Sequence, residues 1–254
     1  MPRANRYFLE GYVWHITHRC HKRDFLLKLK KDREAWVKWL YEATKRYGLT
    51  VLNYCVTSNH IHLLVQSNSQ DDIPRSMQLI AGRTAQEYNS RKSRKGGYWE
   101  DRYHATAIQS GDHLIRCMIY IDLNMVRNGV VKHPRDWSDG GYHEIYKPKS
   151  RYRILNQGAL LAQLGFDSQE KLRESYSVFL DETLKQDKLK RELKWTSSIA
   201  VGDNFFIHKI RDELSVKNKN TKIEQSEDDV ILEVKEESEP YGLKSLSIEW
   251  ACEN

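Results

Sequence analysis

The sequence lacks the features of a membrane-spanning or secreted protein. Hydrophobic residues make up 39% and charged residues 30% of its 254 residues, and no segment is apolar enough to cross a bilayer. The stretch up to Trp14 carries charges and has no long apolar run before a small-residue cleavage site, so no secretory signal is visible. We therefore expect a cytoplasmic protein with no membrane partner.

The sequence also has few cysteines and no Cys-x-x-Cys pair. Its four cysteines are scattered along the chain. This spacing argues against both a zinc ribbon and a disulfide framework. We expect all four to be reduced thiols.

Positive charge is concentrated in the first half of the chain, although the net charge is only +6. Lysines and arginines are frequent between Arg19 and Arg116, whereas acidic residues gather near the C-terminus. Such a distribution suits a polyanion-binding surface, because each neutralised phosphate releases counterions. Taken alone, however, lysine-rich runs are more often ordinary solvated surface.

Hydrophobic patterns predict elements in the order β-α-β-β-α-β-α. The polar turn Thr57-Ser58-Asn59 joins the second and third strands as a hairpin. This order matches a ferredoxin-like antiparallel sheet with helices packed on one face, which is an α+β architecture. The strands are expected at 12–18, 49–56, 60–66 and 103–109, and the helices at 31–47, 72–88 and from 112 towards 128.

The pattern divides the chain into three regions. Residues 1–137 form the core domain, and residues 138–215 form a helical extension. Residues 216–254 are rich in charge and are expected to be flexible, although the run Val230-Ile231-Leu232 could dock elsewhere. Within the extension, helices are expected at 157–163, 168–190 and 204–214.

The sharpest local feature is His60-Ile61-His62 in the third predicted strand. Side chains two residues apart on a strand point to the same face. Two imidazoles there can chelate a divalent ion, with a third donor from another element and open positions for substrate. The alternative is that one histidine only packs or forms hydrogen bonds.

Tyr120 and Asn124 form a second feature, because residues four apart share a face of a helix. That face offers a phenol nucleophile and an amide oxygen together. A phenol with a pKa of about 10 needs nearby positive charge or a metal to attack a phosphodiester. The alternative is that Tyr120 is an aromatic residue of the core.

Four separated segments together resemble one protein family. They are residues 11–19 (GYVWHITHR), 54–65 (YCVTSNHIHLLV), 98–103 (YWEDRY) and 120–129 (YIDLNMVRNG). In order and spacing, the chain resembles the REP-associated tyrosine transposases of the HUH endonuclease superfamily, which are related to single-strand insertion-sequence transposases. The resemblance identifies residues 1–137 as the catalytic domain.

This resemblance implies a metal-dependent endonuclease and strand transferase that cleaves and rejoins single-stranded DNA at hairpin-forming repeats. It implies that Tyr120 forms a covalent 5′-phosphotyrosine link, and that His60, His62 and Asn124 bind Mg²⁺ or Mn²⁺. The start of the chain also resembles the family's start, so Arg3 is expected to contact DNA.

Two prolines that are common in the family are absent. Met125 follows Asn124, and Ser58 precedes Asn59, where the family commonly has proline. Neither change removes a catalytic atom, so activity is expected. A proline that fixes a turn or bend can nevertheless help to aim the tyrosine helix.

Other residues compete for roles around this constellation. Further arginines are candidates for phosphate contacts, with solvated surface as the alternative; these are Arg83, Arg102, Arg116 and Arg127. The remaining nearby histidines are not expected to bind the metal directly; these are His15, His18, His104 and His113. The aromatic residues Tyr98, Trp99 and Tyr103 either stack on unpaired bases or form a buried cluster.

Two other functions stay open at this point. The chain could bind or regulate repeat DNA without catalysis, although its intact nucleophile and metal-ligand candidates favour an enzyme. Alternatively, the extension after about residue 150 could be a nucleic-acid adaptor, in which case its deletion would abolish DNA binding while the catalytic half stays folded. The sequence does not distinguish a monomer from a homodimer.

Overall fold

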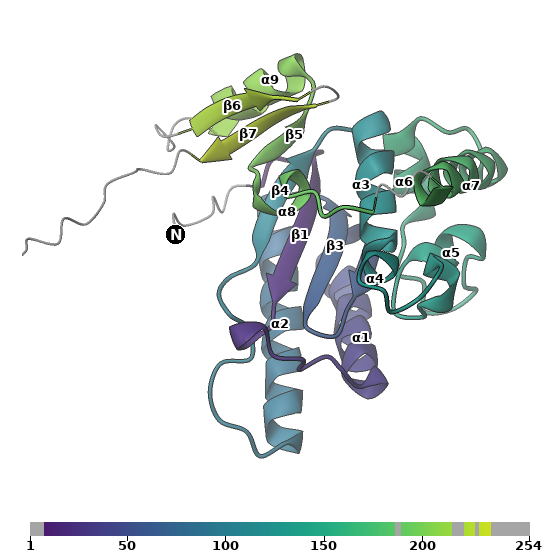
Figure 1. The fold of residues 1–254 in the computed structure, drawn as a ribbon. Coiled ribbons are helices and arrows are strands. Elements are labelled where there is room, and N and C mark those ends of the chain that lie inside the picture. The colour runs from purple at the N-terminus through teal and green to yellow at the C-terminus, as the bar shows by residue number, and fades with distance from the viewer. Residues whose placement is uncertain (1–7, 186–188, 215–220, 227–228, 235–254) are drawn as a thin grey trace, which may run out of the picture.

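The computed structural model describes residues 8–185, 189–214, 221–226 and 229–234. Within these residues a seven-stranded sheet has the order β2-β3-β1-β4-β5-β7-β6 (Figure 1). The strands are β1 (Val13–Arg19), β2 (Thr50–Val56), β3 (His60–Gln66), β4 (His104–Ile108), β5 (Ala200–Gly202), β6 (Thr221–Gln225) and β7 (Val230–Val234).

Helices occur in both halves of the described chain. They are α1 (Lys30–Tyr47), α2 (Asp72–Arg91), α3 (Asp112–Asp122), α4 (Asn124–Arg127), α5 (Tyr142–Tyr146), α6 (Gln157–Leu164), α7 (Gln169–Lys185), α8 (Lys194–Ser197) and α9 (Asn204–Leu214). Two short 3-10 helices are η1 (His21–Arg23) and η2 (Pro134–Asp136). No helix in the described part of the chain is long and apolar enough to span a bilayer.

The four strands of the N-terminal half, β1 to β4, are antiparallel, as the sequence predicts. β1 lies between β3 and β4, and β2 pairs with the other side of β3. β-branched and aromatic residues are frequent along these strands, which suits a buried pleated surface. The predicted α+β class and the β-α-β-β-α-β-α order are therefore confirmed.

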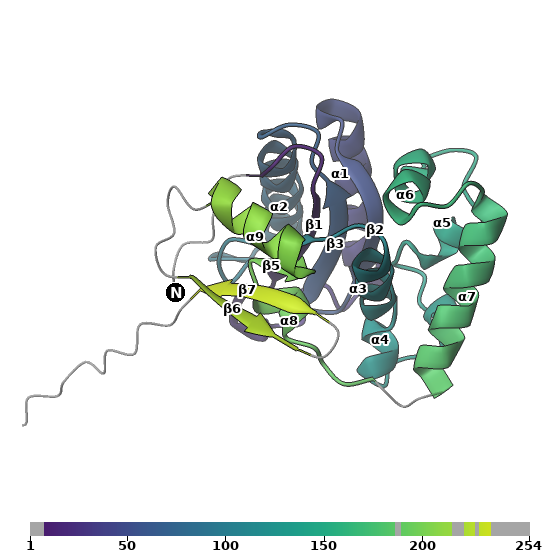
Figure 2. The same ribbon diagram turned by 90° about the horizontal axis from the view of Figure 1, so that it is seen from above.

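Helices cover both faces of this sheet (Figure 2). α1 and α2 pack on one face, where the rings of Trp36 on α1 and Tyr54 on β2 lie 6.4 Å apart. α3 lies on the opposite face, where Asp122 accepts a hydrogen bond from Asn53 of β2. α1 and α2 thus pack on one face of the sheet, as expected. The strands are nevertheless buried on both faces, so α3 forms a second helical layer on the opposite face.

The helix expected from 112 towards 128 is divided. α3 ends at Asp122 and α4 begins at Asn124, because Leu123 between them has a ψ of 1° instead of the helical value. The helix expected at 168–190 is also shorter, since α7 is described as far as Lys185 and residues 189 and 190 are not helical. The second difference concerns a helix end, where residue pattern specifies least, whereas the first is a break inside the predicted helix.

The C-terminal extension is helical but also enlarges the central sheet. β5 pairs in parallel with β4, and β7 pairs with β5 on its other side. β6 then completes an antiparallel pair with β7. The predicted flexibility is therefore wrong for residues 221–225 and 230–234, because the apolar run Val230-Ile231-Leu232 docks on β5 despite its charged neighbours.

Candidate active site

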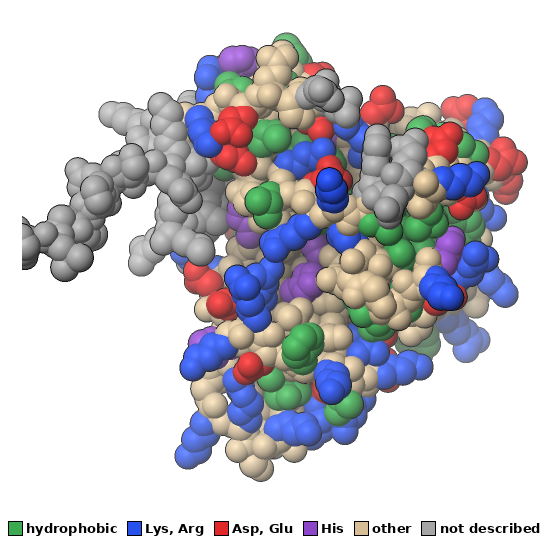
Figure 3. All heavy atoms as spheres, viewed as in Figure 1, with side chains coloured by type: hydrophobic (Ala, Val, Ile, Leu, Met, Phe, Trp, Pro, Cys, Tyr) green, Lys and Arg blue, Asp and Glu red, His purple; other side chains and the backbone are tan. Residues whose placement is uncertain are grey.

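The His-Ile-His motif lies on the face of the sheet that α3 covers. Across the antiparallel β1–β3 pair, Arg19 lies opposite His60, and Thr17 lies opposite His62. Since residues two apart on a strand share a face, His15 and Arg19 point to the same side as both motif histidines. Figure 3 shows histidine side chains in the middle of the molecule, beside Lys and Arg side chains.

His62 is buried, with 2% of its surface exposed, and both of its ring nitrogens have polar neighbours. Nε2 lies 2.9 Å from Asn124 Nδ2, and Nδ1 lies 2.9 Å from His15 Nε2. The amide nitrogen of Asn124 only donates, so His62 Nε2 accepts and carries no hydrogen. His62 therefore presents a bare Nε2 on the side of Asn124.

The turn before β3 fixes the other motif histidine. The Thr57 hydroxyl accepts hydrogen bonds from the backbone N–H groups of Asn59 and His60, at 3.3 and 3.1 Å. This hydroxyl supplies a constraint on the turn that does not depend on proline. His60 Nδ1 lies 2.8 Å from Asn59 Oδ1, which only accepts, so His60 also leaves its Nε2 without a hydrogen.

Tyr120 lies beside these histidines. Its ring centroid is 5.9 Å from that of His62 and 6.3 Å from that of His15. The guanidinium carbon of Arg127 lies 4.1 Å from the Tyr120 ring centroid, and Arg127 also donates a hydrogen bond to the Tyr120 carbonyl oxygen. Tyr120 is thus buried, with 5% of its surface exposed, as in the core alternative, but two imidazoles and a guanidinium are among its neighbours.

The break in the helix keeps Asn124 on the same side as Tyr120. The backbone N–H of Leu123 donates to Ile119 O at 2.9 Å, so the helical bond pattern continues to the break. Met125 lies in the first turn of α4, where an N–H needs no partner within the helix. The absence of proline at this position is therefore compatible with the placement of Tyr120 and Asn124.

Burial keeps the titratable groups of the site neutral near neutral pH. It lowers the pKa of His60 to about 4 and the pKa of His62 well below its ordinary value. Burial also raises the pKa of Tyr120, and the nearby charges of Arg127 and Arg191 oppose that rise. The imidazoles can thus offer lone pairs, whereas the phenol needs additional positive charge to lose its proton.

The donor set fits a divalent ion. The bare Nε2 atoms of His60 and His62 are two donors, and the amide of Asn124 is the third. Within the described ranges no group of three or more His, Cys, Asp or Glu side chains could hold a metal. For Asn124 to be the third donor, its amide oxygen would have to take the place of the nitrogen that now faces His62 Nε2.

Of the arginines predicted to contact phosphate, Arg127 packs on the Tyr120 ring, and Arg116 pairs with an acidic residue. Arg116 lies on α3 and forms an ion pair with Asp229 at 2.7 Å. Its charge is therefore matched by a carboxylate from the segment before β7. The sequence could not predict this pairing, because the partners are more than a hundred residues apart.

The other predicted arginines lie elsewhere. The guanidinium carbon of Arg83 lies 4.7 Å from a Trp39 ring centroid, on the side of the sheet that α1 and α2 cover. The Arg83 prediction therefore finds no support at the Tyr120 site. Arg102 is exposed in the segment before β4, and Arg3 lies outside the described residues.

Three residues that the sequence reasoning did not select complete the surroundings of Tyr120. The charge of Arg19, together with those of Arg191 and Arg127, lowers the pKa of His60. The ring of Trp195, from α8, has its centroid 6.3 Å from that of Tyr120. Alternation along β1 could have indicated Arg19, whereas no local pattern indicates the two C-terminal residues.

The aromatic residues near β4 form a cluster. Ring centroids lie 4.9 Å apart between Tyr98 and Trp99, and 4.1 Å apart between Trp99 and His18. Tyr98 is buried, and Tyr103 packs partly buried against the core. These contacts favour the buried-cluster alternative over base stacking.

The two remaining histidines, His104 and His113, each have a polar neighbour other than His62. His104 Nε2 lies 2.9 Å from the carbonyl oxygen of Ser198. His113 Nε2 lies 3.3 Å from a carboxylate oxygen of Asp229. That neither binds the metal directly stays a prediction.

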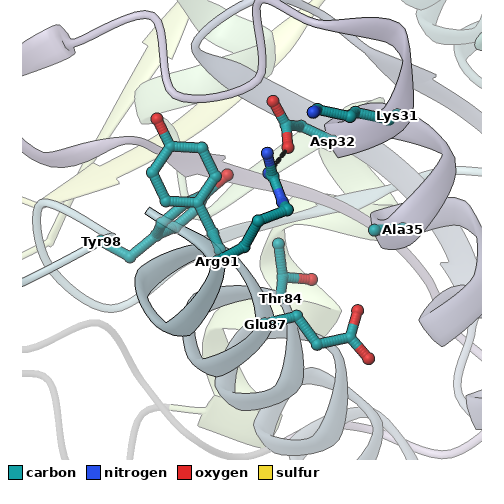
Figure 4. Close-up of a pocket in the computed structure, with 8 residues that line it drawn as sticks. Lys31, Asp32, Ala35, Thr84, Glu87, Arg91 and Tyr98 are labelled. Atoms are coloured by element: carbon teal, nitrogen blue, oxygen red, sulfur yellow. Dashed lines mark hydrogen bonds and ion pairs between the residues drawn. The ribbon is translucent and has the colours of Figure 1, made fainter. Parts of the chain in front are cut away.

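A cavity between α1 and α2 lies on the other face of the sheet (Figure 4). Asp32 and Arg91 form an ion pair in its lining, beside Thr84 and Tyr98. None of its lining residues is a histidine. The cavity is therefore separate from the His60–His62 face.

Asp122 anchors the end of the helix that carries Tyr120. It accepts hydrogen bonds from Asn53 Nδ2 at 2.9 Å and from the Tyr176 hydroxyl at 2.5 Å. Burial raises the pKa of Asp122 to about 7, although both hydrogen bonds act in the opposite direction. This buried network ties α3 to β2 and to α7 of the extension.

The raised pKa makes the contribution of Asp122 to stability dependent on pH. Because the folded pKa of about 7 exceeds the unfolded value, this contribution is complete below about pH 4 and is lost as pH rises through about 7. We expect the stability lost in Asp122→Asn to be largest near pH 4 and to shrink towards neutral pH. Urea unfolding of both proteins across this range measures the difference, and a difference independent of pH would contradict the prediction.

Comparison with known proteins identifies a related family. Residues 9–124 match a family model described as "Transposase IS200 like". This range runs from before β1 to Asn124, so it contains both motif histidines and Tyr120. A protein of Haemophilus influenzae (strain ATCC 51907 / DSM 11121 / KW20 / Rd), named for the REP-associated tyrosine transposases, is 28% identical over 159 residues, which are 58% of this chain and 89% of the relative.

Two solved structures are also similar, each with 18% sequence identity. A REP-associated tyrosine transposase bound to a REP hairpin matches 63% of this chain and 96% of its own, with a TM-score of 0.49. A protein of Deinococcus radiodurans R1, described as a transposase, matches 45% of this chain and 89% of its own, with a TM-score of 0.34. From the family model and the named relative, the predicted resemblance to the REP-associated tyrosine transposases is confirmed, and residues 9–124 are the part of the chain that matches the IS200-like transposase model.

Proposed function

We propose that this chain is a single-strand DNA endonuclease and strand transferase that cleaves and rejoins DNA at hairpin-forming repeats. The observation that supports this proposal is that a phenol, two imidazole nitrogens without a hydrogen and an amide lie close together on one face of the sheet. The Tyr120 and His62 ring centroids are 5.9 Å apart, and Asn124 Nδ2 lies 2.9 Å from His62 Nε2. A nucleophile beside a candidate metal site supports phosphodiester chemistry.

Tyr120 is the proposed nucleophile. Its Oη forms a bond to phosphorus while the bond from phosphorus to the 3′-oxygen breaks, which leaves a 5′-phosphotyrosine link. The phenol loses its proton, and the 3′-oxygen gains one to become a hydroxyl. Attack by another 3′-hydroxyl on the link reverses these changes, so rejoining needs no ATP.

His60, His62 and Asn124 are the proposed ligands of one Mg²⁺ or Mn²⁺ ion. Such an ion, when bound, polarises the phosphate and stabilises the charge that develops on its oxygens. The bare Nε2 atoms of both histidines support this assignment. Asn124 would have to turn its amide, because its nitrogen and not its oxygen now lies next to His62.

Arg19, Arg127 and Arg191 are the proposed phosphate-binding groups. Arg19 lies opposite His60, and Arg127 packs on the Tyr120 ring. After burial, the charges of these two and of Arg191 contribute to the lowered pKa of His60. A planar guanidinium offers several donors that match phosphate oxygens. Two of these arginines come from the region of family resemblance, and Arg191 comes from the extension.

We expect Arg19→Gln to reduce the rate of DNA cleavage by roughly 100-fold, because one donor to the developing phosphate charge is lost. Single-turnover cleavage of an end-labelled hairpin measures this rate. Arg46→Gln is a matched control, since Arg46 lies on α1 at the other face and pairs with Glu42. Equal rates for Arg19→Gln and the control would remove Arg19 from the site.

Hairpin-forming repeats are the proposed substrate because the named relative is associated with REP elements. A protein that binds such repeats without cleaving them is the second candidate, and the basic first half of the chain supports both. The intact Tyr120 and its neighbours favour the enzyme. A binding protein has no need of a nucleophile next to metal ligands.

A selection experiment tests the proposed function directly. The protein is incubated with a library of single-stranded hairpins and Mn²⁺ or Mg²⁺, and DNA that remains attached after denaturation is sequenced. We expect a defined set of hairpins joined to the protein only when the metal is present. Hairpins that bind but never become attached would favour the second candidate.

A further inference from the structure

His15 is fully buried in β1 and lies directly behind the candidate metal site. Its Nε2 is 2.9 Å from His62 Nδ1, and its Nδ1 is 2.7 Å from the carbonyl oxygen of Trp195. The two imidazoles are nearly parallel, with an interplanar angle of 15°. A continuous path of polar contacts therefore runs from a backbone carbonyl of α8, through His15 and His62, to Asn124.

The donor and acceptor at each contact follow from chemistry. A carbonyl oxygen only accepts, so His15 Nδ1 carries a hydrogen. A charged imidazolium in this position would be buried with no carboxylate at either ring nitrogen, which is costly. The neutral His15 ring therefore has a bare Nε2 and accepts a hydrogen bond from His62 Nδ1–H.

The same assignment determines the other nitrogen of His62. A neutral imidazole with a hydrogen on Nδ1 has a bare Nε2. Nε2 of His62 is the atom that lies 2.9 Å from the Asn124 amide nitrogen, which independently requires it to accept. The contacts at both ends of the path therefore require the same tautomer of His62.

We propose that His15 is a positioning residue that holds His62 in the Nδ1–H tautomer and so directs its Nε2 lone pair to the metal position. The Trp195 carbonyl oxygen holds His15 in its own Nδ1–H tautomer in the same way. This inference rests on the proposed metal site, because the tautomer of His62 matters to function only if Nε2 is a ligand. It gives the C-terminal extension a direct part in organising the site.

Two substitutions separate positioning from packing. His15→Gln keeps an acceptor, Oε1, that can reach the hydrogen on His62 Nδ1, whereas His15→Leu fills the space without one. His18→Gln is a matched control, because His18 is also buried in β1 but stacks on Trp99 at the other face. Thermal unfolding of all three proteins establishes that they are folded.

The first measurement is the ¹⁵N chemical shift of the His62 ring nitrogens in the metal-free protein. We expect the Nδ1–H tautomer in the wild type, in His15→Gln and in His18→Gln, and a substantial Nε2–H fraction in His15→Leu. An unchanged tautomer in a folded His15→Leu protein would overturn the proposal. So would an Nε2–H tautomer in the wild type or in His15→Gln.

The second measurement is Mn²⁺ affinity without DNA, by calorimetry. We expect His15→Leu to weaken Mn²⁺ binding by roughly 10- to 100-fold and His15→Gln to restore most of it. Equal affinity in the wild type and in His15→Leu would overturn the role of His15. If the wild type has the Nδ1–H tautomer but binds no Mn²⁺, the proposed metal site fails while the control of the tautomer by His15 is upheld.

Discussion

We expect Tyr120→Phe to abolish covalent attachment to single-stranded hairpin DNA, with a loss of at least about 10³-fold. The substitution removes one hydroxyl and keeps the ring, so contacts with Arg127 and the histidines are retained. DNA affinity should consequently change by less than about threefold, because phosphate contacts and the basic surface are unaltered. Denaturing gels report attachment, and a native binding assay reports affinity.

Tyr41→Phe is the matched control for this experiment. Tyr41 lies on α1 and packs against Tyr152, far from the His-Ile-His motif along the opposite face. It should form the covalent product at the rate of the wild type. A covalent product that persists in Tyr120→Phe would exclude Tyr120 as the nucleophile.

The second large effect is expected for the motif histidines. His60→Ala and His62→Ala should each reduce metal-dependent cleavage by roughly 100-fold or more, because stabilisation by a metal ion contributes several kcal/mol to such a reaction. DNA binding should fall much less. Cleavage rates as a function of Mn²⁺ or Mg²⁺ concentration, with binding measured separately, test both statements.

His208→Ala provides the control for these variants, since His208 is exposed on α9. His62→Ala also removes the contacts with His15 and Asn124, so its folding is checked by thermal unfolding. His60 lies at the start of β3 and is less enclosed. Cleavage at the wild-type rate after either substitution would contradict the proposed metal site.

Much of the N-terminal half of the chain could be predicted because its signals are local. Alternation of residue type defines β1 and β3, and the same period of two places His60 and His62 on one face. The four-residue spacing of Tyr120 and Asn124 correctly places both near His62, even though the helix is divided at Leu123. Residues four apart stay on the same side across such a break when the backbone hydrogen bonds continue around it.

What could not be predicted depends on contacts between distant segments. Nothing in the sequence near Arg116 indicates that its charge is matched by Asp229. Nothing near Trp195 indicates that its carbonyl meets His15. The expected flexibility of residues 221–225 and 230–234 was wrong for the same reason, since the pairing of β7 with β5 outweighs an unfavourable composition.

The structure also changes how the extension should be tested. Deleting everything after about residue 150 would expose the edge of β4 and remove the carbonyl that contacts His15. Loss of DNA binding in that deletion would therefore not identify an adaptor function. Single substitutions such as Arg191→Gln keep the fold and report whether the extension acts at the site.

The most direct measurement identifies the amino acid that carries the DNA. The wild-type protein is trapped on a cleaved hairpin in the presence of Mn²⁺, digested with a protease and a nuclease, and analysed by tandem mass spectrometry. We predict a 5′-linked nucleotide on the hydroxyl of Tyr120. A nucleotide on any other residue, or a cleaved hairpin with no attached protein, would contradict the tyrosine mechanism.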